Sequence, residues 1–141
     1  MQAQTEKGVG ELLGETHGKT VSWTIKEITP HGIKMELNQE GEFAGSLYSA
    51  RELDTVNVFQ KADGTSEWEA KVIHMTNEGE VVVSSARGTG KATGLTTIRA
   101  DGESILMTQS PRLSSVNMKK LRIEITADTA TGEFHSKAYI E

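Results

Sequence analysis

The sequence predicts an all-β fold, a single antiparallel up-and-down β-barrel with at most one short helix near residues 110–117. Apolar residues alternate with polar ones along most of the chain, helical spacing is sustained nowhere, and turn signals with glycine separate the alternating segments. Because the connections are short, strands that are neighbours in the sequence should pair in space. A sheet of this many strands normally closes and so hides its edges, which favours a barrel over a sandwich.

The predicted strands follow from the alternation, which places every second side chain on one face. The pattern is clear at Val21, Trp23 and Ile25, and again from Trp68 to His74. In chain order the expected strands cover residues 9–14, 20–28, 32–39, 42–49, 54–61, 66–76, 80–88, 94–100, 103–109, 119–127 and 133–140.

Five dipeptides that end in glycine are predicted to form tight hairpins, because glycine adopts a positive φ without steric cost. They are Glu40-Gly41, Asp63-Gly64, Glu78-Gly79, Asp101-Gly102 and Thr131-Gly132. The short helix is expected where Ser110 can cap a turn that begins with Pro111. These signals together describe an antiparallel meander.

The 141 residues fit one domain, since a single core usually serves about 100–200 residues. We expect a flexible N-terminal segment at residues 1–8 and one barrel domain at residues 9–141. Hydrophobic residues make up 35% and charged residues 25% of the chain, a mixture typical of a globular protein. The formal net charge of -5 disfavours binding to nucleic acid or to an anionic membrane.

No apolar run approaches the roughly 18 residues that span a bilayer, and the first residues show no charged segment followed by an apolar one. We therefore expect a cytoplasmic protein that does not enter the membrane. Apolar residues occupy both strand faces in Val81–Val83 and in Ile105–Met107. Because both faces must then be covered, we expect a homo-oligomer, a dimer or a trimer.

The candidate ligand-binding residues are those that alternation directs into the barrel. Apolar walls are expected from Trp23, Met35, Trp68, Val72, Ile105 and Met107, and orienting polar groups from His74, Arg87 and Gln109. His74 shares its strand face with Trp68 and Val72, so it should point inward. Two interpretations of His74 stay open: a core histidine with both nitrogens hydrogen-bonded, or a group that orients a ligand or transfers a proton.

Other chemistry finds little support in the sequence. The chain has no cysteine, and its four histidines lie at no spacing typical of metal ligands, so neither a metal nor another cofactor is predicted. No Gly-x-Ser-x-Gly motif marks a hydrolase nucleophile. Carboxylates such as Glu67, Glu69 and Glu124 alternate with the apolar residues, so we expect most acidic side chains to face solvent. No catalytic residue is assigned.

Four short segments that contain glycine resemble a family of small, uncharacterised prokaryotic β-barrel proteins. They are Gly10–Lys19, Gly41–Gly45, Gly88–Lys91 and Ile98–Glu103, and the likeness runs from about Gly10 to Glu141. Proteins of this family are themselves similar to allene oxide cyclase-like and other calycin-style barrels, in which an antiparallel barrel encloses an apolar cavity. The resemblance implies a barrel with such a cavity and assigns no catalytic residue.

Three hypotheses for the function follow. In the first, the barrel binds a small apolar or amphipathic molecule in its interior. In the second, the same cavity folds a flexible substrate into the conformation that cyclises or isomerises, an orientation effect that needs no sequence motif. In the third, side chains fill the interior and the protein acts through its outer surface as an oligomer. The presence of a cavity distinguishes the third from the others, and turnover distinguishes the second from the first.

Overall fold

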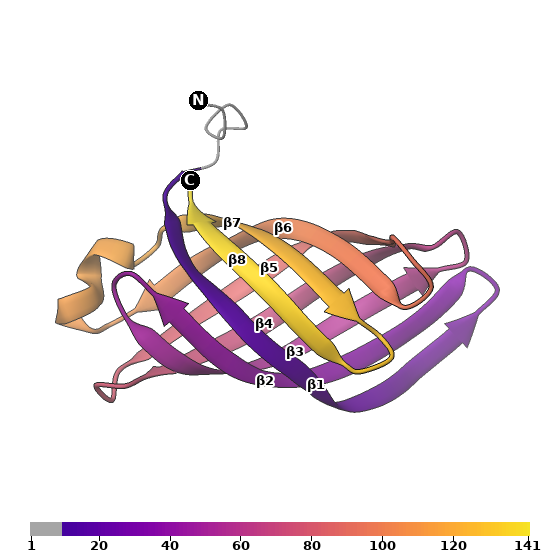
Figure 1. The fold of residues 1–141 in the computed structure, drawn as a ribbon, viewed down its shortest axis with the longest axis horizontal. Helices are drawn as coiled ribbons and strands as arrows, with labels where there is room; N and C mark the ends of the chain where they lie inside the picture. Colours follow the sequence, from indigo (N-terminus) through magenta and orange to yellow (C-terminus); the bar gives the residue numbers. More distant parts are fainter. Residues whose placement is uncertain (1–9) are drawn as a thin grey trace.

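The computed structural model describes residues 10–141 as a closed barrel of eight strands (Figure 1). Each strand pairs antiparallel with the next one in the chain, and the last pairs with the first, so the sheet has no open edge. The strands are β1 (Leu12–Thr29), β2 (Gly32–Gly45), β3 (Ser49–Lys61), β4 (Thr65–Thr76), β5 (Val81–Ala92), β6 (Thr97–Thr108), β7 (Lys120–Asp128) and β8 (Glu133–Ile140). The predicted fold class is confirmed. The predicted flexible segment, residues 1–8, lies outside the described residues.

Three strands each unite two of the predicted strands. The predicted strands 9–14 and 20–28 merge into β1, 32–39 and 42–49 merge into β2, and 94–100 and 103–109 merge into β6. Gly41 and Gly102, predicted to form hairpins, instead lie inside β2 and β6. A Cβ at Gly41 would lie 2.6 Å from the carbonyl oxygen of His17, and one at Gly102 would lie 2.8 Å from Cζ2 of Trp68. Here glycine therefore permits close approach between neighbouring chain segments rather than a turn.

The other three hairpin glycines are confirmed. Gly64, Gly79 and Gly132 adopt positive φ angles of +88°, +85° and +81° in the turns after β3, β4 and β7. Only glycine adopts these angles at little cost, which explains why each turn signal ends in this residue. The long hairpin of β1 and β2 turns at Pro30 and His31.

The short helix expected at residues 110–117 is present as the 3-10 helix η2 (Pro111–Val116), which covers one end of the barrel. Leu113 and Val116 of η2 are buried in a cluster with Leu13 of β1, so this end is filled by apolar side chains. The helix is also tied to the β4–β5 turn, because Arg112 donates a hydrogen bond of 3.0 Å from Nε to Oε2 of Glu80. Among the described residues, no helix is long and apolar enough to cross a membrane.

Candidate functional site

A cavity of about 210 Å³ lies inside the barrel. Its wall is mainly apolar and includes Trp23, Met35, Leu37, Val56, Val58, Trp68, Ala70, Val72, Leu106, Ile123 and Ile125. Small side chains such as Ala70 and Ala86 face inward beside Trp68, so the interior at this level is not filled. Trp23 lines the cavity and is 49% exposed, so this residue contacts both the interior and solvent.

The structure brings five of the nine predicted ligand-binding residues to this cavity. These are Trp23, Met35, Trp68, Val72 and His74. Their placement follows from the alternation along β1, β2 and β4, which the sequence shows clearly. A role in binding stays a prediction for each of them.

The other four predicted residues, Arg87, Ile105, Met107 and Gln109, do not line the cavity, and this part of the prediction is wrong. On β6 the inward residues are Ser104 and Leu106, both buried, so Ile105 and Met107 point outward and are each 38% exposed. On β5 the inward residue is Ala86, so Arg87 lies on the outer surface. Gln109 follows the end of β6 and is exposed. Apolar residues occur on both faces of these strands, so alternation alone could not identify the inner face.

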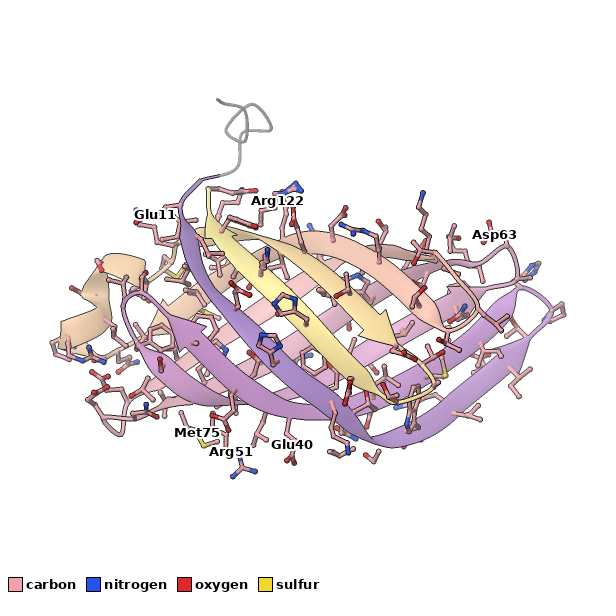
Figure 2. All side chains as sticks on the ribbon, in the orientation of Figure 1. Glu11, Glu40, Arg51, Asp63, Met75 and Arg122 are labelled. Atoms are coloured by element: carbon pink, nitrogen blue, oxygen red, sulfur yellow. The ribbon has the colours of Figure 1, made fainter. Side chains whose placement is uncertain are left out.

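A cluster of buried polar residues lies at the η2 end of the cavity. Glu52 on β3 is directly opposite His74 on β4 in the strand register. Figure 2 shows the preceding residue of β3, Arg51, and the following residue of β4, Met75, pointing away from the barrel. Because side chains alternate along a strand, Glu52 and His74 point inward. They are only 6% and 7% exposed, respectively.

Hydrogen bonds connect this cluster into one network. His74 Nε2 lies 2.6 Å from Oε1 of Glu52, and the hydroxyl of Thr16 donates to the same oxygen at 2.8 Å. On its other side, His74 Nδ1 lies 2.7 Å from the hydroxyl oxygen of Tyr48, in the loop between β2 and β3. When Nδ1 of His74 accepts a hydrogen bond from the Tyr48 hydroxyl, Nε2 carries a ring proton and donates a hydrogen bond to Glu52. The ring of Phe43 stacks on His74 with centroids 4.5 Å apart, which holds the imidazole in place.

Asp54, two residues after Glu52, is the second carboxyl group of the cluster. Burial, together with the hydrogen bond and negative charge of Glu52, raises the pKa of Asp54 to about 10. Burial also raises the pKa of Glu52, but hydrogen bonds from His74, Asp54 and Thr16 outweigh it and leave this pKa below its ordinary value. At neutral pH Asp54 therefore keeps its proton and Glu52 is ionised, so the pair holds one proton.

The phenol of Tyr48 is also perturbed. Burial and the negative charge of Glu52 raise the pKa of Tyr48 above its ordinary value of 10. Tyr48 therefore keeps its proton at neutral pH and can serve as the hydrogen-bond donor to His74.

Two polar atoms of the cavity wall lack a hydrogen-bond partner. Among the described residues, three buried side-chain atoms are unpaired: Asp54 Oδ1, Ser104 Oγ and Arg122 Nε. Asp54 and Ser104 both line the cavity. An unpaired buried polar atom costs about 1–3 kcal/mol, so these two positions favour a bound group that can form the missing hydrogen bonds.

Of the polar residues in this cluster, the sequence analysis predicted only His74 to point into the barrel. The expectation that most acidic side chains face solvent holds for Glu67 and Glu69, which are exposed, whereas Glu52 and Asp54 are buried exceptions. A signal for the two buried carboxyls is present, because they share strand parity with Val56 and Val58. The predicted strand began at residue 54, which separated Glu52 from this pattern.

Neither a protein-family model nor a curated protein sequence matches the chain. Solved structures show the same fold. A conserved protein of unknown function from Rhodopseudomonas palustris is similar with a TM-score of 0.76 and 12% identity, over 93% of this chain and 96% of that one. A β-barrel-like protein from Acinetobacter baumannii has a TM-score of 0.75 and 14% identity, over 92% and 93% of the two chains.

An enzyme from the fungus Penicillium herquei is also similar, with a TM-score of 0.65 and 16% identity over 94% of this chain and 96% of that one. At such identities the comparisons show a common barrel fold, shared with uncharacterised bacterial proteins and with one enzyme. They show no specific function. The expected likeness to allene oxide cyclases and the cytoplasmic location stay predictions.

Proposed function

We propose that the barrel binds a small amphipathic organic molecule, with its apolar body against the cavity wall and an uncharged polar group at Asp54 or Ser104. The observation that carries the proposal is the pair of unpaired buried oxygens in an otherwise apolar cavity. The cavity of about 210 Å³ is smaller than the roughly 300–1,000 Å³ of pockets for drug-sized ligands, so the ligand is small. An interior filled by side chains, the third hypothesis from the sequence, has no support from this cavity.

The chemistry of the polar end follows from the charges around it. Protonated Asp54 shares its proton with Glu52, which leaves Oδ1 as an acceptor, whereas the hydroxyl of Ser104 can donate or accept. A ligand hydroxyl can donate to Asp54, and a ligand hydroxyl or carbonyl can accept from Ser104. A ligand carboxylate is disfavoured because the ionised Glu52 would repel it in a poorly solvated site.

A matched pair of probes tests this proposal. Calorimetric titrations at neutral pH should detect binding of naphthol and much weaker binding of naphthoate, which has a similar ring but a negative charge. Ser104→Ala should weaken naphthol binding, and Ala70→Leu, which fills the cavity, should abolish it. Native mass spectrometry of protein purified from its own host would identify the physiological ligand. Equal affinity for the two probes, or naphthol binding that survives Ala70→Leu, contradicts the proposal.

The carboxyl pair supports a second candidate function, an isomerase or cyclase that works by proton transfer. Two adjacent carboxyls whose environments drive their pKa values apart can act as a base and an acid at the same pH. Glu52 would accept a proton from a carbon next to a carbonyl group while Asp54 transfers its proton to the carbonyl oxygen. The product is a neutral enol, and the pair still holds one proton. Return of a proton to a different carbon completes an isomerisation.

Deuterium exchange separates catalysis from binding alone. If the pair transfers protons, the protein should accelerate exchange of the α-hydrogens of tetralone in heavy water, as followed by NMR. Glu52→Gln should remove this acceleration, whereas Asp101→Asn on the outer surface should not. Exchange no faster than in buffer would leave binding as the function.

His74→Gln tests whether the histidine belongs to the site or only to the core. A purely structural role predicts a loss of roughly 1–3 kcal/mol of stability, since Glu52 or Tyr48 loses a buried hydrogen bond. A site role predicts loss of binding or exchange while the melting temperature changes little. The opposite outcome would end the assignment of His74 to the site.

A further inference from the structure

Two histidines and a glutamate meet on the outer face of the barrel, where the first and last strands close the sheet. Glu15 and His17 lie two residues apart on β1, so their side chains share one face. His135 of β8 is directly opposite His17 in the strand register. Residues two apart on one strand and their partner opposite on the next strand are close enough to interact. This group is separate from the interior cavity, because Thr16 between Glu15 and His17 is the residue that points inward.

The side chains are arranged around one point. The imidazole rings of His17 and His135 stack with centroids 4.3 Å apart and an angle of 15° between their planes. Nε2 of His135 lies 2.7 Å from Oε1 of Glu15. One ligand atom from each of the three residues lies within 4.8 Å of the other two. Two imidazole nitrogens and one carboxylate oxygen form a donor set suited to Zn²⁺ and other divalent transition metals.

We propose that Glu15, His17 and His135 bind a divalent transition-metal ion, with Zn²⁺ as the expected metal. Three protein ligands leave a fourth tetrahedral position for water or an incoming group. Because the ligands come from β1 and β8, the ion would connect the two ends of the chain across the strand pair that closes the barrel. A metal that binds only the folded state then stabilises the barrel.

The surrounding charges are compatible with a bound cation. Glu15 is partly exposed, and one of its carboxylate oxygens lies close to both imidazoles, so it is accessible to an incoming cation. Lys137 lies opposite Glu15, and Glu42 of β2 lies opposite His17. The positive charge of Lys137 opposes the cation, whereas the negative charge of Glu42 favours it.

The spacing of histidines along the sequence predicted no metal site, because that reasoning considered only ligands close to one another in the chain. His17 and His135 are brought together by the pairing of β1 with β8. Neither histidine is required to fill the core, since both lie on the outer face and remain partly or fully accessible.

A zinc titration tests the proposal. The protein is first treated with a chelator and then dialysed. Isothermal titration with Zn²⁺ should give one ion per chain with a micromolar or tighter Kd, and Zn²⁺ should raise the melting temperature. Cobalt, used in a parallel titration, should give the visible absorption bands of a tetrahedral site. His17→Gln and His135→Gln should each weaken zinc binding at least about tenfold, the lower end of the loss seen when metal sites are perturbed.

His31→Gln provides the matched control, because His31 lies in the exposed turn between β1 and β2. This variant should bind zinc as the wild type does. Circular dichroism checks that each variant is folded, and Glu15→Gln supplies a third variant that keeps a side chain of the same shape. The proposal is overturned if the wild type binds zinc only weakly and without a defined stoichiometry. It is overturned equally if the variants at Glu15, His17 and His135 bind zinc as tightly as His31→Gln does.

Discussion

Replacement of Asp54 by asparagine tests the proton that the interior carboxyl pair is expected to hold. Asp54 is 8% exposed, and its pKa of about 10 in the folded protein lies far above the ordinary value of 3.8. Because the folded-state pKa is raised, folding binds a proton, and the stability contributed by this group is complete only below the unfolded pKa. It decreases as the pH rises from about 4 toward the folded-state pKa of about 10. Asparagine has nearly the same shape and no proton to lose, so Asp54→Asn should remove this pH dependence.

The size of the effect follows from proton linkage. Each pH unit between the two pKa values changes the free energy of unfolding by about 1.4 kcal/mol for one group. Between about pH 5 and pH 8 the wild type should therefore lose on the order of 4 kcal/mol relative to Asp54→Asn. The variant should be at least as stable as the wild type at neutral pH, which is unusual for a substitution at a buried polar position.

Urea unfolding at a series of pH values measures the difference, with Trp23 and Trp68 as fluorescent reporters. The comparison between the two proteins at each pH cancels the titration of groups that they share. Asp101→Asn, at an exposed position on β6, is the matched control and should follow the wild type. A difference in stability between wild type and Asp54→Asn that stays constant across this range would refute the assignment of the proton to Asp54.

Three further predictions concern the scaffold. Hydrogen bonds from Arg112 and others lower the pKa of Glu80 to about 2 from 4.5, so the stability that this carboxylate contributes is present above about pH 4.5 and is lost as the pH falls toward 2. Glu80→Gln should remove that acid dependence in thermal unfolding, and an unchanged acid profile would contradict it. Gly102→Ala should lower the free energy of unfolding by about 1–3 kcal/mol, because the added Cβ would collide with the carbonyl oxygen of Arg87 and lie 2.8 Å from the ring of Trp68; an unchanged urea midpoint would exclude these collisions. The homo-oligomer expected from the sequence should be visible by light scattering and weakened by Ile73→Lys on the outer face, where Ile73 is 43% exposed; a monomeric wild type would show that expectation to be wrong.

Much of the barrel follows from local sequence. Alternation with period two identifies most strands and the inward direction of Trp23, Trp68 and His74, since the side-chain direction in a strand is a local property. Turn glycines mark the true hairpins only where φ is positive, as at Gly64. Inside β6, Gly102 has the same type of preceding residue but permits close packing against the backbone of Arg87 and the ring of Trp68. Local sequence does not distinguish a turn glycine from a close-packing glycine. At a close-packing glycine, the atoms that a side chain would collide with belong to other strands.

The sequence itself thus determines three features. They are the all-β fold class, the closure of the barrel implied by short connections, and the presence of His74 in the interior. Only the tertiary structure brings Glu52 opposite His74 and His135 opposite His17, because these contacts depend on the register between strands. The protonation of the carboxyl pair is likewise a property of the fold. Ionisation depends on how much water and charge surround a group, and burial inside the barrel beside Glu52 creates that environment around Asp54.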